Sequence, residues 1–291
     1  MKRRPTSPVA ALSARFPRFS LSACTRSLGA ALILAGGVAA AAVPGALAQS
    51  NTMQNMQGMQ GMQMGAKTVV LVHGAFADGS SWDKVIPLLK AKGLNVVAVQ
   101  NPLTSLADDV AATKRAIDAQ SGPVILVGHS WAGVVITEAG NDDKVKALVY
   151  IAAFAPAAGQ SAAGSSKGYP PAPGFSEIKT DAAGFMTMTP AGIAKDFAQD
   201  LPAKQTAVMA VTQGPINSKD FAEPVTTAAW TTKPSWYIVA SHDRMIQPAQ
   251  EEAIAKAIHA TVTTLPTSHV PMQSRPKDVA AAIIAAADSV K

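Results

Sequence analysis

One serine of the chain has small residues two positions before and after it, at the point where an apolar run at 124–127 gives way to a helical pattern. Residues 128–133 read GHSWAG. Small neighbours allow a strained turn from strand to helix on which the hydroxyl of Ser130 is exposed, which is the geometry of a nucleophile elbow. The fifth position of this motif is normally glycine, whereas here it is Ala132, with Gly133 one step later. The alternative for Ser130 is a structural role as a helix N-cap.

A serine hydroxyl is a poor nucleophile until a base removes its proton, and the chain has five histidines that could do so. His269 follows the last predicted strand, in the loop TSHVP, which fits the chain order Ser, Asp, His of nucleophile-elbow enzymes. His73 and His129 lie in tight glycine-containing turns, where a structural role is expected. His259 ends a predicted helix and His242 precedes the last strand. His269 is therefore the predicted base.

The acid that orients this base must stand at the carboxyl end of a strand to reach His269. Asp243, in the segment SHDR, directly follows the predicted strand 236–239. The other slot for such an acid, just past Ile151, reads AAFAPAA and contains none. The alternative for Asp243 is an exposed ion pair with Arg244.

Acyl transfer also needs backbone N–H groups that hold the developing oxyanion. The segment HGAF follows the first predicted strand, 68–72, at the place where one such donor is expected. Ala75 is the predicted donor, with Phe76 in reserve, and the second donor is Trp131, the residue after the serine. The side chains of Phe76 and Trp131 are further expected to contact substrate. This chemistry requires neither a metal nor an organic cofactor.

The elements that must position these residues alternate between apolar runs and helical patterns, which indicates a parallel sheet flanked by helices. Helical spacing is seen at 82–92, after a capping box formed by Ser105 and Asp108, at 250–259 and from Pro276 onward. The predicted strands are 68–72, 96–99, 124–127, 147–151, 236–239 and 261–265.

An irregular stretch, about 155–234, interrupts this alternation and is rich in Pro, Gly, Ala and Thr, with short helical pieces such as 191–199. Such a long insertion is more often a functional lid than a plain loop. It carries six Lys and six acidic residues, so neither charge of substrate is favoured. The lid side chains that either line an apolar pocket or attach the lid to the body are Phe175, Phe185, Met186, Met188 and Trp230.

The segments HGAFADGSSW and GHSWAG, the loop of Asp243 and the segment SHVPM resemble, in this order, small bacterial α/β-hydrolases of the serine esterase type. These are related to plant methylesterases and hydroxynitrile lyases, and the resemblance spans nearly all of 68–291. It implies the α/β-hydrolase fold, a predominantly parallel sheet flanked by helices with an inserted lid. In that group the lyases typically carry Lys after the triad His and Thr in place of the Gly of the HG pair. Val270 and Gly74 occupy those positions here, so the resemblance implies the esterase branch.

The first 48 residues contain six basic and no acidic residues, and 28–48 is an uncharged apolar run ending in ALA. This pattern predicts a cleaved signal peptide, with an uncleaved membrane anchor as the alternative, and therefore export to the periplasm or beyond. Cys24, the only cysteine, would be removed, which excludes disulfides and a thiolate zinc site. Without the leader, 19 basic residues face 19 acidic ones, so neither nucleic acid nor a stable membrane association is expected.

Residues 49–65 form a tract of Met, Gln and Gly that predicts a disordered linker, since it offers little to bury. Its thioethers are soft ligands of the kind that suit Cu(I). The mature domain is then 66–291, and the predicted function is a serine carboxylesterase that acts on small to medium apolar esters through an acyl-enzyme. The alternatives are a cofactor-free perhydrolase or acyltransferase with the same triad, and a non-catalytic periplasmic protein that binds a ligand or copper.

Overall fold

The computed structural model describes residues 67–290. The predicted signal peptide, 1–48, and the Met-rich linker, 49–65, lie outside the described residues. Between 67 and 290, none of the helices combines the length and the apolarity needed to cross a bilayer.

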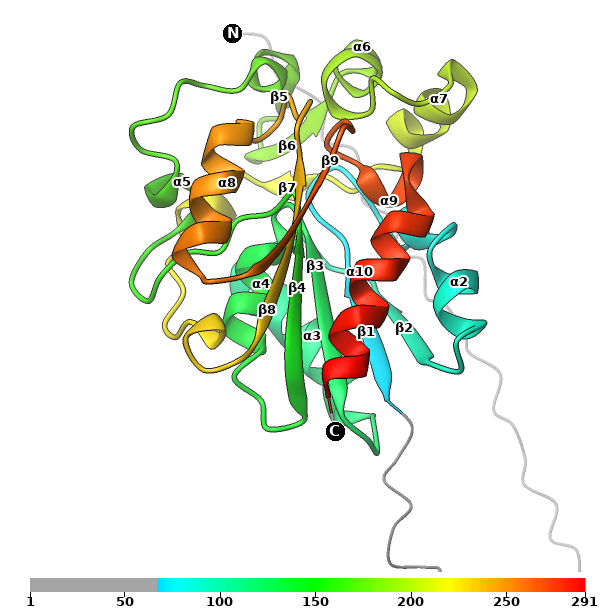
Figure 1. The fold of residues 1–291 in the computed structure, drawn as a ribbon. Helices are drawn as coiled ribbons and strands as arrows, with labels where there is room; N and C mark the ends of the chain where they lie inside the picture. The colour runs from blue at the N-terminus through cyan, green and yellow to red at the C-terminus, as the bar shows by residue number, and fades with distance from the viewer. Residues whose placement is uncertain (1–66, 291) are drawn as a thin grey trace, which may run out of the picture. The chain divides into compact units, whose positions relative to one another are not determined.

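Six parallel strands form the central sheet, in the order β2-β1-β3-β4-β8-β9 (Figure 1). Each of the predicted strands is present, with bounds within two residues of those expected. Because all neighbours are parallel, the carboxyl ends of the strands meet at one edge, which points upward in Figure 1. The strands are β1 (Thr68–Val72), β2 (Asn95–Val99), β3 (Val124–His129), β4 (Val145–Ile151), β8 (Ser235–Ala240) and β9 (Thr261–Leu265).

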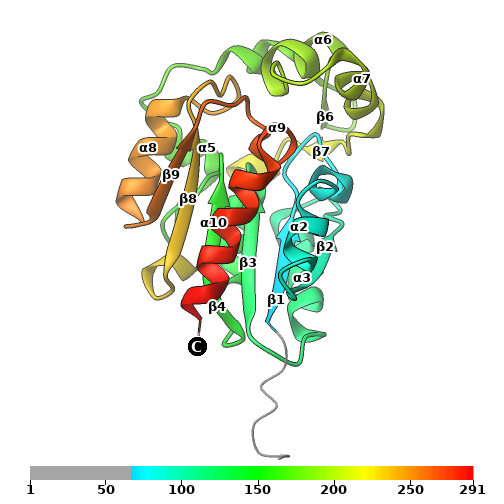
Figure 2. The same cartoon turned by 45° about the vertical axis from the view of Figure 1, so that its right-hand side comes forward.

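Helices cover both faces of this sheet, which is why β1 and β3 consist almost entirely of buried apolar residues (Figure 2). One face carries α2 (Ile86–Lys90) and α10 (Pro276–Ser289), and the other carries α3 (Leu106–Asp118) and α4 (Ala132–Ala139). A further helix, α8 (Pro248–Ala257), packs against β8 at one end of the sheet.

The beginning of α3 agrees with its predicted capping box, since the side chain of Ser105 accepts a hydrogen bond from the backbone N–H of Asp108. The prediction of a single helix over 82–92 is wrong. The chain instead forms a 3-10 turn, η1 (Gly79–Trp82), and α2 begins only at Ile86. Pro87 explains the difference, because proline lacks an N–H and is tolerated only in the first turn of a helix.

The chain between β4 and β8, residues 152–234, builds a cap over the carboxyl edge of the sheet and then returns beside α4 to the start of β8 (Figure 1). Its three short strands form an antiparallel sheet in the order β5-β6-β7, which the sequence did not predict because strands of two to four residues show no usable alternation. The sequence also did not predict the helix α7 (Ala203–Thr212). The helical stretch expected at 191–199 begins as α6 (Pro190–Gly192) and continues as a π-helix, η3 (Ile193–Phe197).

This inserted cap contains α5 (Ala162–Ser165), η2 (Pro173–Glu177), β5 (Ile178–Thr180), β6 (Phe185–Met188), α6 (Pro190–Gly192), η3 (Ile193–Phe197), α7 (Ala203–Thr212), β7 (Ile216–Asn217), η4 (Asp220–Ala222) and η5 (Ala229–Thr231). After β9, the short helix α9 (Pro271–Ser274) precedes α10.

The strand order reverses at β1, since β2 lies on one side of it and β3 on the other. In open parallel sheets the ligand crevice lies at such a switch point, outside the carboxyl ends of the strands. Val72 at the end of β1 pairs with Gly128 in β3, so the turn at 73–76 and Ser130 leave the sheet side by side. The topology thus brings together the two segments that the sequence marked for chemistry.

The turn into α4 is packed so closely that a side chain at Gly133 has no room. A Cβ there would lie 2.0 Å from the carbonyl oxygen of Phe154, and one at Gly128 would lie 2.7 Å from that of Ala132. The glycine of the motif is therefore needed at 133, one step later than usual, while the fifth position accepts alanine.

Gly133→Ala should destabilise the protein by about 3 kcal/mol, because the new methyl group displaces backbone rather than a flexible side chain. The free energy of unfolding from urea titrations measures this. Gly164→Ala is the matched control, since its Cβ would meet only the side-chain oxygen of Ser161, at 3.3 Å. Equal stabilities for the two variants would contradict the close-packing argument.

Candidate active site

Ser130 occupies a strained backbone conformation at the junction of β3 and α4, with φ of 54°. Positive φ is rare for a residue with a side chain, and it persists only when the surroundings enforce it. Its N–H donates to the carbonyl of Ile151 over 3.1 Å, and its own carbonyl accepts from the N–H of Phe154 over 3.3 Å. The backbone of the serine is thus fixed from β4 and from the segment after that strand, as a nucleophile elbow requires.

The turn after β1 lies directly against this elbow. A Cβ at Gly74 would lie 2.8 Å from both the Cβ of Ser130 and the carbonyl oxygen of His129. His73 holds the turn in shape, because its Nε2 accepts from the N–H of Asn101, which leaves Nδ1 to donate to the carbonyl of Gly74, each over 2.9 Å. Burial lowers the pKa of His73, so it stays neutral in the structural role expected for it.

Ala75 and Phe76 line the same cavity as Ser130. Within residues 67–290, the backbone N–H groups of Ala75 and Trp131 donate to no protein acceptor. Two free donors that flank a serine hydroxyl are suited to hold an oxyanion. Phe76 adopts a positive φ of 57°, a second strained position beside the elbow.

Asp243 and His269 are joined by a hydrogen bond of 2.5 Å, in which Nδ1 of the ring donates to Oδ2 of the carboxylate. Both side chains are buried. The other oxygen, Oδ1, accepts from the backbone N–H groups of Met245 at 2.6 Å and Ile246 at 2.9 Å. Since Nδ1 is engaged, Nε2 is the ring nitrogen left for the cavity that His269 lines together with Ser130. Ser130, Asp243 and His269 therefore come together at one edge of the sheet.

The ion pair between Asp243 and Arg244, the alternative drawn from the sequence, does not form. Arg244 instead donates to Asp196 of η3 over 2.6 Å. Gln199, three residues further along the inserted cap, donates to the backbone carbonyl of His242 over 2.7 Å. The cap thus holds the loop that carries the acid, through residues that no motif in the sequence had marked.

The loop that carries His269 is held in the same way. Asp200 of the cap accepts from the N–H of Ser268 at 2.9 Å and from its hydroxyl at 2.5 Å. The ring of Phe197 packs edge-on against that of His269, with centroids 5.1 Å apart. His129 contributes from the elbow, because its Nε2 donates to the backbone carbonyl of His269 over 2.8 Å. His129 is therefore a support for the neighbouring histidine, in agreement with its expected structural role.

The cavity over Ser130 has a volume of about 570 Å³ and contains no charged side chain in its lining. Of the five cap side chains predicted to line a pocket or attach the lid, Phe175 and Met186 line it, whereas Phe185, Met188 and Trp230 do not. The lining consists of Ala75, Phe76, Ser130, Phe154, Ala162, Ala163, Ser166, Phe175, Ile178, Thr180, Met186, Ser218, Phe221, Met245, Ile246 and His269.

The side chain of Trp131 is not part of this lining, contrary to the substrate contact expected for it. Its indole is fully buried, and Nε1 donates to Oδ2 of Asp109 over 2.8 Å. The residue after Ser130 starts the turn into α4 and points back toward α3, so its ring lies beneath the cavity. Phe221 of the cap packs on this ring, with centroids 5.2 Å apart, and itself faces the cavity.

Comparison with known proteins agrees with this architecture. The alpha/beta hydrolase family matches residues 69–282, which is nearly all of the part that the structure describes. The chain belongs to the alpha/beta hydrolase family. The resemblance seen in the sequence and the fold class that it implied are both confirmed.

Individual relatives of this α/β-hydrolase are distant. The probable hydrolase R7 of Phoma sp. is 28% identical over 239 residues, which cover 72% of this chain and 93% of the relative. An alpha-hydroxynitrile lyase of Arabidopsis thaliana is 32% identical over 102 residues, covering 30% of this chain and 40% of the lyase. Among solved structures, polyneuridine aldehyde esterase matches with a TM-score of 0.70 at 19% identity, covering 77% of this chain and 100% of the esterase, a likeness of fold.

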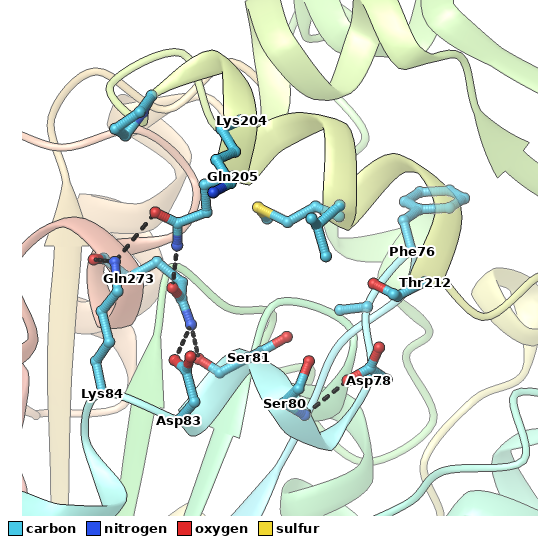
Figure 3. A pocket seen from close by; sticks show the side chains of 14 residues that line it. Phe76, Asp78, Ser80, Ser81, Asp83, Lys84, Lys204, Gln205, Thr212 and Gln273 are labelled. Carbon is cyan, nitrogen blue, oxygen red and sulfur yellow. Dashed lines mark hydrogen bonds between the residues drawn. The ribbon is translucent and has the colours of Figure 1, made fainter.

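A second cavity of the α/β-hydrolase, of about 440 Å³, lies between η1 and α7 and shares Phe76 with the first (Figure 3). Hydrogen bonds cross it from the body to the cap. Lys84 of the body donates to the side-chain oxygen of Gln205 on α7 of the cap over 3.1 Å. Within the body, Gln273 of α9 donates to the carbonyl of Ser81 over 2.7 Å. Gln205 also bonds to Gln273, four residues after His269. This network attaches α7 beside the histidine loop.

Beneath Trp131, the α/β-hydrolase buries two carboxyl groups close together. Asp109 accepts from Trp131 and from the N–H of Leu103, whereas both carboxyl oxygens of Asp220 lack a hydrogen-bond partner within residues 67–290. Burial, together with the charge of Asp109 and of Glu223, raises the pKa of Asp220 to about 7. Burial likewise raises the pKa of Asp109 to about 6. Both groups are therefore protonated in mildly acidic solution and ionised in alkaline solution.

Asp220→Asn should stabilise the α/β-hydrolase at pH 8 by about 2 kcal/mol and have little effect at pH 4. In the unfolded chain this carboxyl has its ordinary pKa, so the folded protein holds a proton that the unfolded chain has lost. Stability therefore falls as pH rises from about 4 to about 7, and the amide removes that loss. The free energy of unfolding, obtained from urea titrations of the variant and the wild type at pH 4 and pH 8, measures this difference. The exposed Asp288→Asn is the control, and an equal gain in both variants would contradict the assignment.

Proposed function

We propose that this α/β-hydrolase is a serine carboxylesterase that acts through an acyl-enzyme. The observation that supports it most is the shared cavity of Ser130 and His269, with His269 hydrogen-bonded to the buried Asp243. A hydroxyl on a strained turn, a base and an orienting carboxylate are the three parts that activate a serine.

In the first step, Nε2 of His269 takes the proton of the Ser130 hydroxyl while the oxygen attacks the ester carbonyl. The carbonyl carbon becomes tetrahedral, and the backbone N–H groups of Ala75 and Trp131 hold its oxyanion. Asp243 keeps the imidazole in the tautomer with the proton on Nδ1 and stabilises the imidazolium that forms. The imidazolium then gives its proton to the departing alkoxide, and an acyl-serine remains.

In the second step, His269 takes a proton from water, whose oxygen attacks the acyl carbon of the ester on Ser130. The tetrahedral intermediate collapses, the serine oxygen leaves with the proton from the imidazolium, and a carboxylic acid is released. A perhydrolase or an acyltransferase would differ only in this step, with peroxide or an alcohol in place of water. Within the cavity, no observation favours either of them over water.

Two features argue against a hydroxynitrile lyase. Lyases of the related group typically carry Lys after the triad histidine, and here Val270 is buried and apolar. They also carry Thr where this chain has Gly74, and any Cβ there would lie 2.8 Å from that of Ser130. A non-catalytic ligand- or copper-binding protein would not need the strained turn. Export to the periplasm or beyond remains our proposal from residues 1–48.

Ser130→Ala should abolish ester hydrolysis, with a loss on the order of 10⁶ in kcat, while the domain stays folded. Turnover of a p-nitrophenyl ester measures the loss of hydrolysis, and the circular dichroism spectrum shows whether the domain stays folded. Ser218→Ala removes a hydroxyl from the same cavity and serves as the matched control, with activity expected to change little. Retention of turnover in the Ser130 variant would refute the proposed nucleophile.

The acyl part of the substrate should be apolar and of small to medium length, because the lining of the cavity is mostly apolar and contains no Lys, Arg, Asp or Glu. For p-nitrophenyl esters from acetyl upward, each added methylene should raise kcat/KM by up to about fourfold, equivalent to about 0.8 kcal/mol, until the cavity is full. Esters with an ionised acyl chain of equal length provide the comparison. A flat profile from acetyl to octanoyl, or a preference for the charged esters, would rule this specificity out.

A further inference from the structure

A second carboxyl group lies behind the triad acid. Glu251, in the first turn of α8, is fully buried, and its Oε2 accepts from the backbone N–H of Ala240 at the end of β8 over 3.0 Å. Its carboxyl faces that of Asp243 closely enough for the two to share a hydrogen bond. Within residues 67–290, its other oxygen, Oε1, has no N–H or hydroxyl donor. The proposed mechanism assigns no role to this buried carboxyl group.

A hydrogen bond between two carboxyl groups requires that one of them carries a proton, because an ionised carboxylate can only accept. Asp243 accepts from three N–H groups, those of Met245, Ile246 and the His269 ring, so both of its oxygens already serve as acceptors. Glu251 accepts a hydrogen bond from one N–H group, that of Ala240. Burial, and next the charge of Asp243, raises the pKa of Glu251 well above its usual range. The shared proton therefore belongs to Glu251.

We propose that Glu251 is a positioning residue of this hydrolase, a neutral carboxylic acid whose O–H donates to Asp243 and holds that carboxylate toward His269. It touches neither the substrate nor the reacting atoms, and it acts on the base only through Asp243. A donor on the carboxylate draws charge away from it, so the imidazolium of His269 is stabilised less than it would be by an isolated Asp243. The proposal rests on the proposed function, since it assigns to Glu251 an effect on the general base.

Among the residues that the structure describes, the titratable groups that face Glu251 include no cation to neutralise it. They are Asp243, the neighbouring Glu252 on the same helix, and Tyr237 on β8. The hydroxyl of Tyr237 donates to the carbonyl of Ala153 and accepts from its N–H, and burial raises the pKa of Tyr237 well above its usual range, so this group is neutral. An ionised Glu251 would stand unpaired beside an ionised Asp243.

The test compares Glu251→Gln and Glu251→Leu with the wild type, and uses the exposed Glu252→Gln as a matched control. Gln is uncharged and of the same shape, and its carbonyl can accept from Ala240 while its NH₂ donates to Asp243. Leu fills the space without a donor. The first readout is the pH midpoint of the low-field proton signal of His269 Nδ1, which requires no turnover. The second is the acid limb of kcat/KM against pH.

With a neutral donor at 251, Gln should leave the His269 midpoint within about 0.3 pH unit of the wild type and retain kcat. Leu should raise the midpoint by about 0.5 to 1 unit and lower kcat by about tenfold with little change in KM. A fall of about one unit in the Gln variant would mean that the wild-type carboxyl is ionised, and this would overturn the proposal. Identical midpoints in Gln and Leu would overturn it as well.

If the Leu variant does not fold, the Gln variant still decides between a neutral and an ionised carboxyl. The two proposals fail separately. Absence of ester hydrolysis in the wild type would refute the esterase function, whereas the proton signal of His269 would still report on Glu251.

Discussion

The positive φ of Ser130 is the constraint on which the rest of the site depends. At the end of β3 the chain must reverse into α4 within two residues, and this is possible only where the neighbours lack side chains that would collide. Gly128, Gly133 and Gly74 provide that space, each at a point where a Cβ would come within 3 Å of neighbouring atoms. The strain is local, but it is held by contacts from the turn after β1, from β4 and from the segment after β4.

The inserted cap does more than cover the cavity. Asp196 binds the loop of Asp243 through Arg244, Asp200 binds the loop of His269 through Ser268, and Phe197 packs on the imidazole. A cap attached so directly to the two loops couples the shape of the cavity to the alignment of His269 with Asp243. Substitutions in 193–200 are therefore expected to affect activity as well as specificity.

Buried acids in this hydrolase differ according to the donors around them. Asp243 accepts three hydrogen bonds from N–H groups, which stabilise its charge. Asp220 accepts none from the residues that the structure describes, and its pKa is raised to about 7. Glu251 accepts a single backbone bond beside an existing charge and stays protonated. Burial raises the pKa of a carboxyl group, and each donor directed at the carboxylate works against that rise.

The sequence by itself determined the order of the strands along the chain, the nucleophile-elbow segment and the positions of Asp243 and His269. Apolar runs and glycine-rich turns are local signals, and a parallel sheet must bring the loops at the carboxyl ends of its strands to one edge. Tertiary structure alone decided that the indole of Trp131 is buried under the cavity, that the cap holds both loops and that Glu251 meets Asp243. These contacts join residues that are far apart in the chain or depend on the direction of a side chain. Neither the spacing of residues nor the composition of the chain predicts such contacts.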